Sequence, residues 1–107
     1  MTKVRIEPGV CGFTAEVVAD SEDQMEVRVQ VVSGCKAVQD MMLELGDTFD
    51  AYEVCFQKPG TNLFYEYAHD HFPGHAGCPI AAGITKCIEA ECGLALKRDV
   101  RITFVEA

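Results

Sequence analysis

Two stretches of alternating apolar and polar residues, separated by a short polar segment, constrain the fold more than any other feature. The first stretch covers residues 13–19 and the second covers residues 25–31, with Ser21-Glu22-Asp23 between them. Alternation with a period of two places the apolar side chains on one face of a strand and the polar ones on the other. The pattern therefore predicts a β-hairpin in an antiparallel sheet that is covered on one face only.

The remaining elements follow from similar local signals. Val4 and Ile6 predict a short first strand that stops at Pro8-Gly9. The spacing of apolar residues and the turn residues predict the following elements: a helix from Ser33 or Gly34 to Gly46, a short helix from Leu63 to about His71, a helix from Pro79 to Gly93, and a last strand over Val100–Phe104. The stretch Phe49–Gln57 fits a strand or an irregular segment, although Asp47-Thr48 could equally cap a short helix.

This order of elements predicts an α+β fold, in which helices pack on one face of an antiparallel sheet. The 107 residues form one expected domain, residues 1–107, and 49% of them are hydrophobic, enough to build a core without disulfide bonds. The formal charge of −8 repels phosphates and anionic membrane surfaces, so neither nucleic acid nor a membrane is an expected partner. With no signal-peptide core and no membrane-spanning apolar run, we expect a cytoplasmic protein.

Cys11, Cys35 and Cys78 each stand next to a glycine, at places where a strand or loop leads into the next element. Because the hairpin runs out along one strand and back along the next, Cys11 and Cys35 are expected at the same end of the sheet. In a reducing compartment, six cysteines indicate ligation, thiol chemistry or burial rather than a disulfide framework.

The chemistry of these cysteines favours a metal site. Cys35 and Cys78 fall at predicted helix starts, where unpaired N–H groups and the helix dipole favour the negative thiolate that binds metal. His75, three residues before Cys78, is the best candidate for a fourth ligand. Three cysteines and a histidine suit zinc, and cysteine-rich sets also hold iron–sulfur clusters. Two alternatives remain open: a thiol redox or persulfide-handling site, and an interaction module whose cysteines are structural.

Three short motifs resemble the IscU/NifU N-terminal family of iron–sulfur scaffold proteins. They are Cys11-Gly12 before the hairpin, residues 31–37 with Gly34-Cys35 opening a helix, and His75-Ala76-Gly77-Cys78 opening another. The resemblance covers residues 10–92. It implies that the three cysteines hold a nascent cluster, with iron ahead of zinc, in a carrier or accessory protein rather than an enzyme. It also implies a protein partner in metal or sulfur handling.

The sequence departs from that family at two positions near the cysteines. Phe13 stands where the family has an aspartate that helps to govern cluster release, and the histidine precedes Cys78 by three residues instead of one. The chain also adds a strand before the resemblance and another after it. We therefore expect a divergent relative that keeps the fold and the thiol site but has lost the assembly role.

The other cysteines and histidines are expected to be structural or simply exposed. Cys87 shares the apolar stripe of its helix with Ile84 and Ile88, which predicts a core position. Burial is also the expectation for Cys55 and Cys92. His69 and His71 are expected on the surface.

Overall fold

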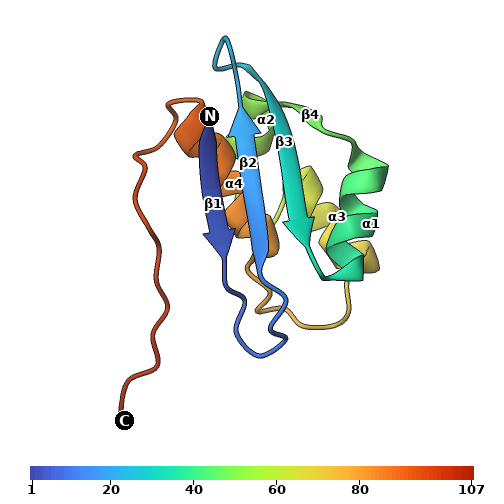
Figure 1. The fold of residues 1–107 in the computed structure, drawn as a ribbon, viewed down its shortest axis with the longest axis vertical. Helices are drawn as coiled ribbons and strands as arrows, with labels where there is room; N and C mark the ends of the chain where they lie inside the picture. The colour runs from blue at the N-terminus through green and yellow to red at the C-terminus, as the bar shows by residue number, and fades with distance from the viewer.

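The computed structural model of the protein describes residues 1–107 as a four-stranded antiparallel sheet with four helices (Figure 1). In chain order the elements are β1 (Thr2–Ile6), β2 (Ala15–Asp20), β3 (Glu26–Ser33), α1 (Lys36–Leu45), β4 (Thr48–Asp50), α2 (Ala51–Cys55), α3 (Leu63–His71) and α4 (Ile80–Glu91). No helix has both the length and the apolar character needed to cross a bilayer.

The sheet has the strand order β1-β2-β3-β4, with every neighbouring pair antiparallel. The predicted first strand and hairpin are confirmed. On β2, Ala15, Val17 and Ala19 are buried while the alternate residues are not. On β3, Val27 and Val29 are buried in the same way. One face of the sheet is therefore apolar and covered by helices, which confirms the expected α+β fold with helices on one face (Figure 1).

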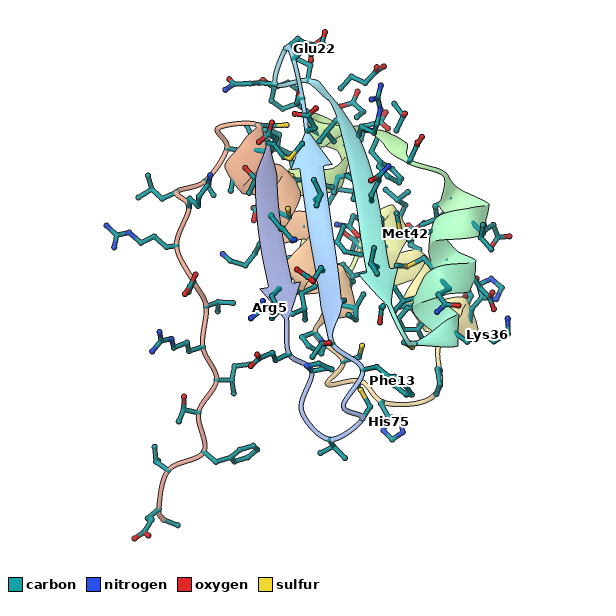
Figure 2. All side chains as sticks on the ribbon, in the orientation of Figure 1. Arg5, Phe13, Glu22, Lys36, Met42 and His75 are labelled. Atoms are coloured by element: carbon teal, nitrogen blue, oxygen red, sulfur yellow. The ribbon has the colours of Figure 1, made fainter.

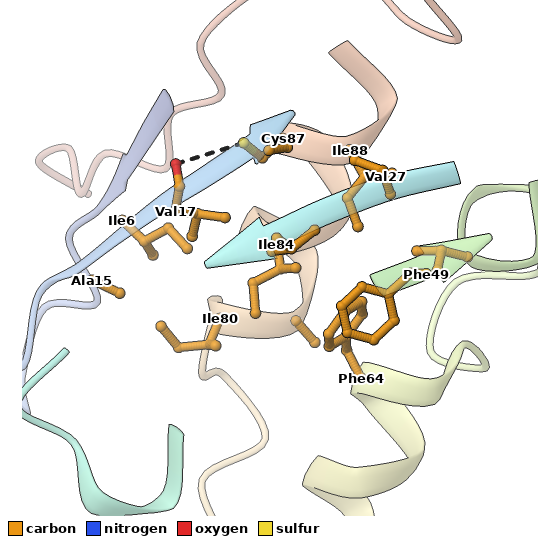
Figure 3. Close-up of a cluster of buried hydrophobic side chains, with 14 of the residues drawn as sticks. Ile6, Ala15, Val17, Val27, Phe49, Phe64, Ile80, Ile84, Cys87 and Ile88 are labelled. Atoms are coloured by element: carbon orange, nitrogen blue, oxygen red, sulfur yellow. Dashed lines mark hydrogen bonds between the residues drawn. The ribbon is translucent and has the colours of Figure 1, made fainter. Parts of the chain in front are cut away.

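The core lies between the sheet and the helices, and α4 supplies much of it (Figure 3). Ile80, Ile84 and Ile88 recur on one face of α4 and are all buried. At the other side of the core, the rings of Phe49 and Phe64 meet with centroids 5.0 Å apart and planes tilted by 55°. A tilted arrangement of this kind is favoured by the quadrupoles of the two rings.

Helix α4 is held against β1 and β2 by contacts along its whole length. Gly83 lies so close to Ile6 that any side chain at this position would collide with it. One turn further on, the Cys87 thiol donates to the carbonyl oxygens of Thr2, at 3.4 Å, and Val17, at 3.7 Å (Figure 3). At the end of the helix, Glu91 accepts a 2.7 Å hydrogen bond from the Thr2 hydroxyl. The end of α4 is therefore fixed beside the start of β1.

The segment Phe49–Gln57, predicted as a strand or an irregular segment, begins in a short strand and continues as a helix. Residues 48–50 pair with β3 as β4, and the chain then turns directly into α2. Asp50 makes this change possible, because its carboxylate accepts hydrogen bonds from the backbone N–H groups of Tyr52 and Glu53 and caps the helix. The predicted cap at Asp47-Thr48 lies one short strand too early.

Other helix boundaries agree with the predictions to within a few residues. Helix α3 has the predicted bounds, and α4 begins after Pro79, which occupies the N-cap position rather than the first helical position. Helix α1 begins at Lys36 with Cys35 as its N-cap, so Cys35 precedes the first turn instead of lying within it.

The predicted last strand over Val100–Phe104 is wrong. Residues 95–107 contain no helix or strand, and this tail runs as an extended chain along the outside of β1 and past its end (Figure 1). The alternation of apolar and polar residues reports a preference for an extended, half-buried chain, but a strand also needs a partner for its backbone groups. Within this chain the segment has none.

Candidate functional site

The four residues predicted as ligands lie in three connections at one end of the sheet. Ile6, Ala15 and Ser33 are paired side by side across β1, β2 and β3. Cys11 lies in the loop between the first two of these residues, and Cys35 follows the third by two positions. The close contact of Gly83 with Ile6 brings the first turn of α4, and therefore Cys78 just before it, to the same end.

A direct contact joins two of these connections, and the sequence did not reveal it. The ring of Phe13 covers Gly34, and a Cβ atom added to Gly34 would lie 3.3 Å from the ring. Phe13 and His75 are both at this end of the molecule, opposite the turn that carries Glu22 (Figure 2). Gly34 was the only available signal, because a glycine beside Cys35 leaves room for a neighbouring side chain.

Cys35 is held in place by its neighbours while its own side chain stays free of capping bonds. Its backbone N–H donates to the Ser33 hydroxyl at 3.1 Å, and the Gln39 amide donates to the Ser33 carbonyl at 2.7 Å. The Cys35 thiol makes no capping hydrogen bond to α1 and is partly buried against the core. The backbone of Cys35 is therefore fixed at a helix N-terminus, and no capping hydrogen bond competes for its sulfur.

Cys11 and Cys78 lie in exposed loops that are shaped by local hydrogen bonds. The N–H of Gly12 donates to the Gly9 carbonyl at 3.0 Å, and both glycines have positive φ angles, of 72° and 94°. Only glycine adopts this conformation at little cost, so the turn around Cys11 requires them. In the other loop, the N–H of Cys78 donates to the His75 carbonyl at 3.1 Å. Both thiols are exposed to solvent.

The side chains at this end are not arranged as a metal site. No three histidine, cysteine, aspartate or glutamate side chains form a group that could hold a metal ion. The structure thus gathers the connections that carry Cys11, Cys35, Cys78 and His75, but it does not bring their ligand atoms to a common point. The ligand roles of these residues stay predictions.

The other three cysteines lie within or beside the core. Cys87 and Cys92 are buried, as predicted. Cys55 is only partly buried and borders a shallow hollow of about 210 Å³ between α2, α3 and α4. Burial, together with Glu89 and Cys92, raises the pKa of Cys55 to about 12, and burial raises the pKa of Cys87 to about 11. Burial likewise raises the pKa of Cys92. All three remain protonated thiols at neutral pH.

These properties predict a large spread in thiol reactivity. The thiolate is the reacting form, so raising the pKa of Cys55 from 9.0 to about 12 lowers its thiolate fraction at pH 7.5 by about 1,000-fold. We expect iodoacetamide to label Cys11 and Cys78 first, and Cys55, Cys87 and Cys92 only slowly, as followed by peptide mass spectrometry. In denaturant all six should react at similar rates. Labelling of native Cys55 as fast as Cys11 would contradict the burial described above.

The two other histidines are on the surface, as expected. His69 and His71 are exposed on the last turn of α3. His69 contacts the Asp70 carboxylate at 3.0 Å, and His71 packs on the Tyr67 ring with centroids 4.4 Å apart.

Comparison with known protein families places almost the whole chain in one group. The family of unknown function DUF6951 matches residues 2–104. The chain belongs to this family. The part that matches DUF6951 includes all four predicted ligands and most of the tail after α4. No curated protein and no solved structure matches the chain. A function for this DUF6951 protein must therefore be argued from its own residues.

Proposed function

We propose that this DUF6951 protein binds an iron–sulfur cluster or a zinc ion through Cys11, Cys35 and Cys78, with His75 as the fourth ligand. The observation that carries the proposal is the meeting of three separate connections at one end of the sheet, each of which bears a cysteine. Cysteines that served only as core residues would be buried, as Cys87 and Cys92 are. Instead, Cys11 and Cys78 are exposed and Cys35 is partly exposed.

Assembly of the site requires the two exposed loops to move toward Cys35. The residues around Cys11 and the residues from Pro73 to Cys78 are exposed and contribute nothing to the core. Few buried contacts would be lost when such loops rearrange, so the cost is small compared with that of moving a packed element. Metal–ligand bonds commonly supply the free energy that orders a site of this kind. Cys35, at the N-cap of α1, is the fixed point around which the others would close.

The choice between iron and zinc rests on the donor set and on the resemblance to the IscU/NifU N-terminal family. Three thiolates and an imidazole are a common tetrahedral set for zinc, and thiolates are also the usual ligands of iron–sulfur clusters. The short motifs around Cys11, Cys35 and Cys78 resemble those of that scaffold family. We therefore propose iron first and zinc second, in a cytoplasmic carrier that works with a protein partner in metal or sulfur handling.

Phe13 gives the proposed site a different character from the sites of the scaffold family. An aspartate at this place would offer a carboxylate oxygen near the cluster, whereas the Phe13 ring packs on Gly34 and shields the turn beside Cys35. Apolar cover lowers solvent access to a metal centre, and solvent access governs its exchange and redox properties. The proposed function is accordingly tight holding of the metal or cluster instead of rapid release.

The test is anaerobic purification of the full chain, followed by reconstitution with Fe²⁺ and sulfide or with Zn²⁺. We expect stoichiometric metal, with acid-labile sulfide and visible absorption in the iron arm. The triple variant Cys11→Ser, Cys35→Ser, Cys78→Ser should lose binding, because a serine hydroxyl is a poor replacement for a thiolate. We expect the triple variant to fold, because none of the three cysteines belongs to the buried core. Circular dichroism checks that it does.

A matched control uses the other three cysteines. Single changes of Cys55, Cys87 and Cys92 to alanine should leave the metal content unchanged, although the two buried positions will lose some stability. His75→Ala should retain metal but bind it more weakly, because three thiolates remain. A chain that stays free of metal after both reconstitutions would refute the proposal, as would a triple variant that binds as well as the wild type.

A further inference from the structure

The segment after α4 carries several large apolar side chains, and these are exposed because the segment does not pack against the rest of the protein. Val100, Ile102 and Phe104 alternate with Arg101 and Thr103. Ile102 is 91% exposed and Phe104 is fully exposed. This is the pattern of a half-buried strand without the sheet that would bury it. Leaving such side chains in water forgoes burial that stabilises most proteins.

The sheet has an unpaired edge at its first strand, β1, where a further strand could pair. β1 pairs with β2 along one side, and the strand order leaves its other side without a partner. Val4 is only partly buried on the covered face at this edge, where a further strand would shield it. An unpaired edge of this kind presents backbone N–H and C=O groups to any extended chain. Val100–Phe104 and β1 have the same length of five residues.

The tail cannot easily place these apolar residues on β1 of its own chain. Helix α4 ends beside the start of β1, where Glu91 contacts Thr2, and the tail runs down the outside of β1 (Figure 1). From Ala95 to Val100 an extended chain advances about 16 Å, whereas the whole of β1 spans only about 13 Å. The residues level with β1 are therefore mainly the polar Lys97, Arg98 and Asp99. The apolar segment lies past the end of β1, as the orange-red part of the tail shows (Figure 1).

We propose that residues Val100–Phe104 form a fifth strand on the β1 edge of a second copy of this chain. Each copy carries both an unpaired edge and an unpaired strand, so two copies that exchange tails satisfy both needs at once. Reciprocal exchange about a two-fold axis closes the assembly at a dimer. The main-chain hydrogen bonds hold the added strand, and the alternate apolar side chains cover Val4 and the edge of the core. This inference is independent of the proposed metal site.

Sedimentation equilibrium of the full chain tests whether two copies exchange their tails to form a dimer. We expect a mass of twice 11.7 kDa at micromolar concentrations. The double variant Ile102→Asp, Phe104→Asp should weaken the dimer by at least about 100-fold, because each lost apolar contact counts twice in a symmetric interface. Leu43→Asp is the control, since Leu43 is also an exposed apolar residue, at 83%, but lies on α1. This variant should keep the dimeric mass.

Hydrogen–deuterium exchange of the backbone amides in residues 100–104 distinguishes the proposed swap of tail strands from other arrangements. In the dimer these amides should be protected, and protection should fall on dilution together with the mass. A monomer with unprotected tail amides at all concentrations would overturn the proposal. So would a monomer in which the tail is protected, because the strand would then pair with β1 of its own chain. A dimer that survives the double variant would place the interface elsewhere.

Discussion

Replacing Phe64 by alanine should destabilise the protein by about 3–5 kcal/mol, the range seen when a large aromatic side chain is removed from a core. Phe64 is fully buried and its ring packs against Phe49 from the short strand β4. The contact joins α3 to the far edge of the sheet, so the cavity left by the substitution would lie between two elements that have few other contacts to close it. Domains of this size have only about 5–15 kcal/mol of stability in total.

The measurement is urea unfolding followed by circular dichroism, since the chain has no tryptophan to report by fluorescence. Phe56→Ala is the matched control, because the Phe56 ring stacks on Tyr52 but is 67% exposed. A substitution at an exposed position such as this is expected to change the free energy of unfolding by no more than about 0.5 kcal/mol. Equal effects of the two substitutions would show that Phe64 does not occupy the core.

The parts of this fold that the sequence predicted are those in which a local pattern and burial agree. The hairpin is an example, because alternation over residues 13–19 and 25–31 coincides with the covered face of β2 and β3. Cys87 is another, since its place on the apolar stripe of α4 was enough to predict burial. The helix starts near Cys35 and Cys78 were also predicted to within a few residues. The hairpin was enough to predict that Cys11 and Cys35 lie at the same end of the sheet.

The features that the sequence did not predict depend on residues that are distant in the chain. Glu91 bonds the Thr2 hydroxyl and the Ser21 N–H. Partial burial acts to raise the pKa of Glu91, but these hydrogen bonds and the nearby amino terminus outweigh it and hold the pKa below its ordinary value. No local pattern marks such a contact. The covering of Gly34 by Phe13 belongs to the same class, and it changes the surroundings of Cys35.

The tail shows the opposite error, in which a local pattern was correct but incomplete. Val100–Phe104 alternates as clearly as β3, yet no strand of the same chain lies beside it. A prediction from periodicity assumes that a partner exists, and the partner is a property of the whole assembly. The proposed strand exchange would reconcile the alternating sequence with the structure of the single chain, because the same residues would then form a strand in the dimer.

Replacing Asn62 by alanine should destabilise the protein by about 2–4 kcal/mol, more than the loss of an ordinary helix cap. Asn62 is 3% exposed and all of its hydrogen-bonding capacity is used. Its side-chain oxygen accepts from the N–H groups of Phe64 and Tyr65 and caps α3. Its side-chain nitrogen donates to the Val54 carbonyl at 3.1 Å and to the Thr85 hydroxyl at 2.9 Å. One side chain thus connects α2, α3 and α4.

The expected cost has two parts that a matched variant separates. Asp50 caps α2 with the same pair of backbone hydrogen bonds but is exposed and donates nothing. Asp50→Ala should therefore cost only about 1 kcal/mol, as a lost cap does. The additional loss of stability in Asn62→Ala measures the cost of leaving the buried Val54 carbonyl without a donor. Water does not easily replace the lost amide there, so this cost is about 1–3 kcal/mol. Equal losses in urea unfolding of the two variants would mean that Asn62 acts as a cap alone, and that α2 and α4 are held to α3 by packing instead.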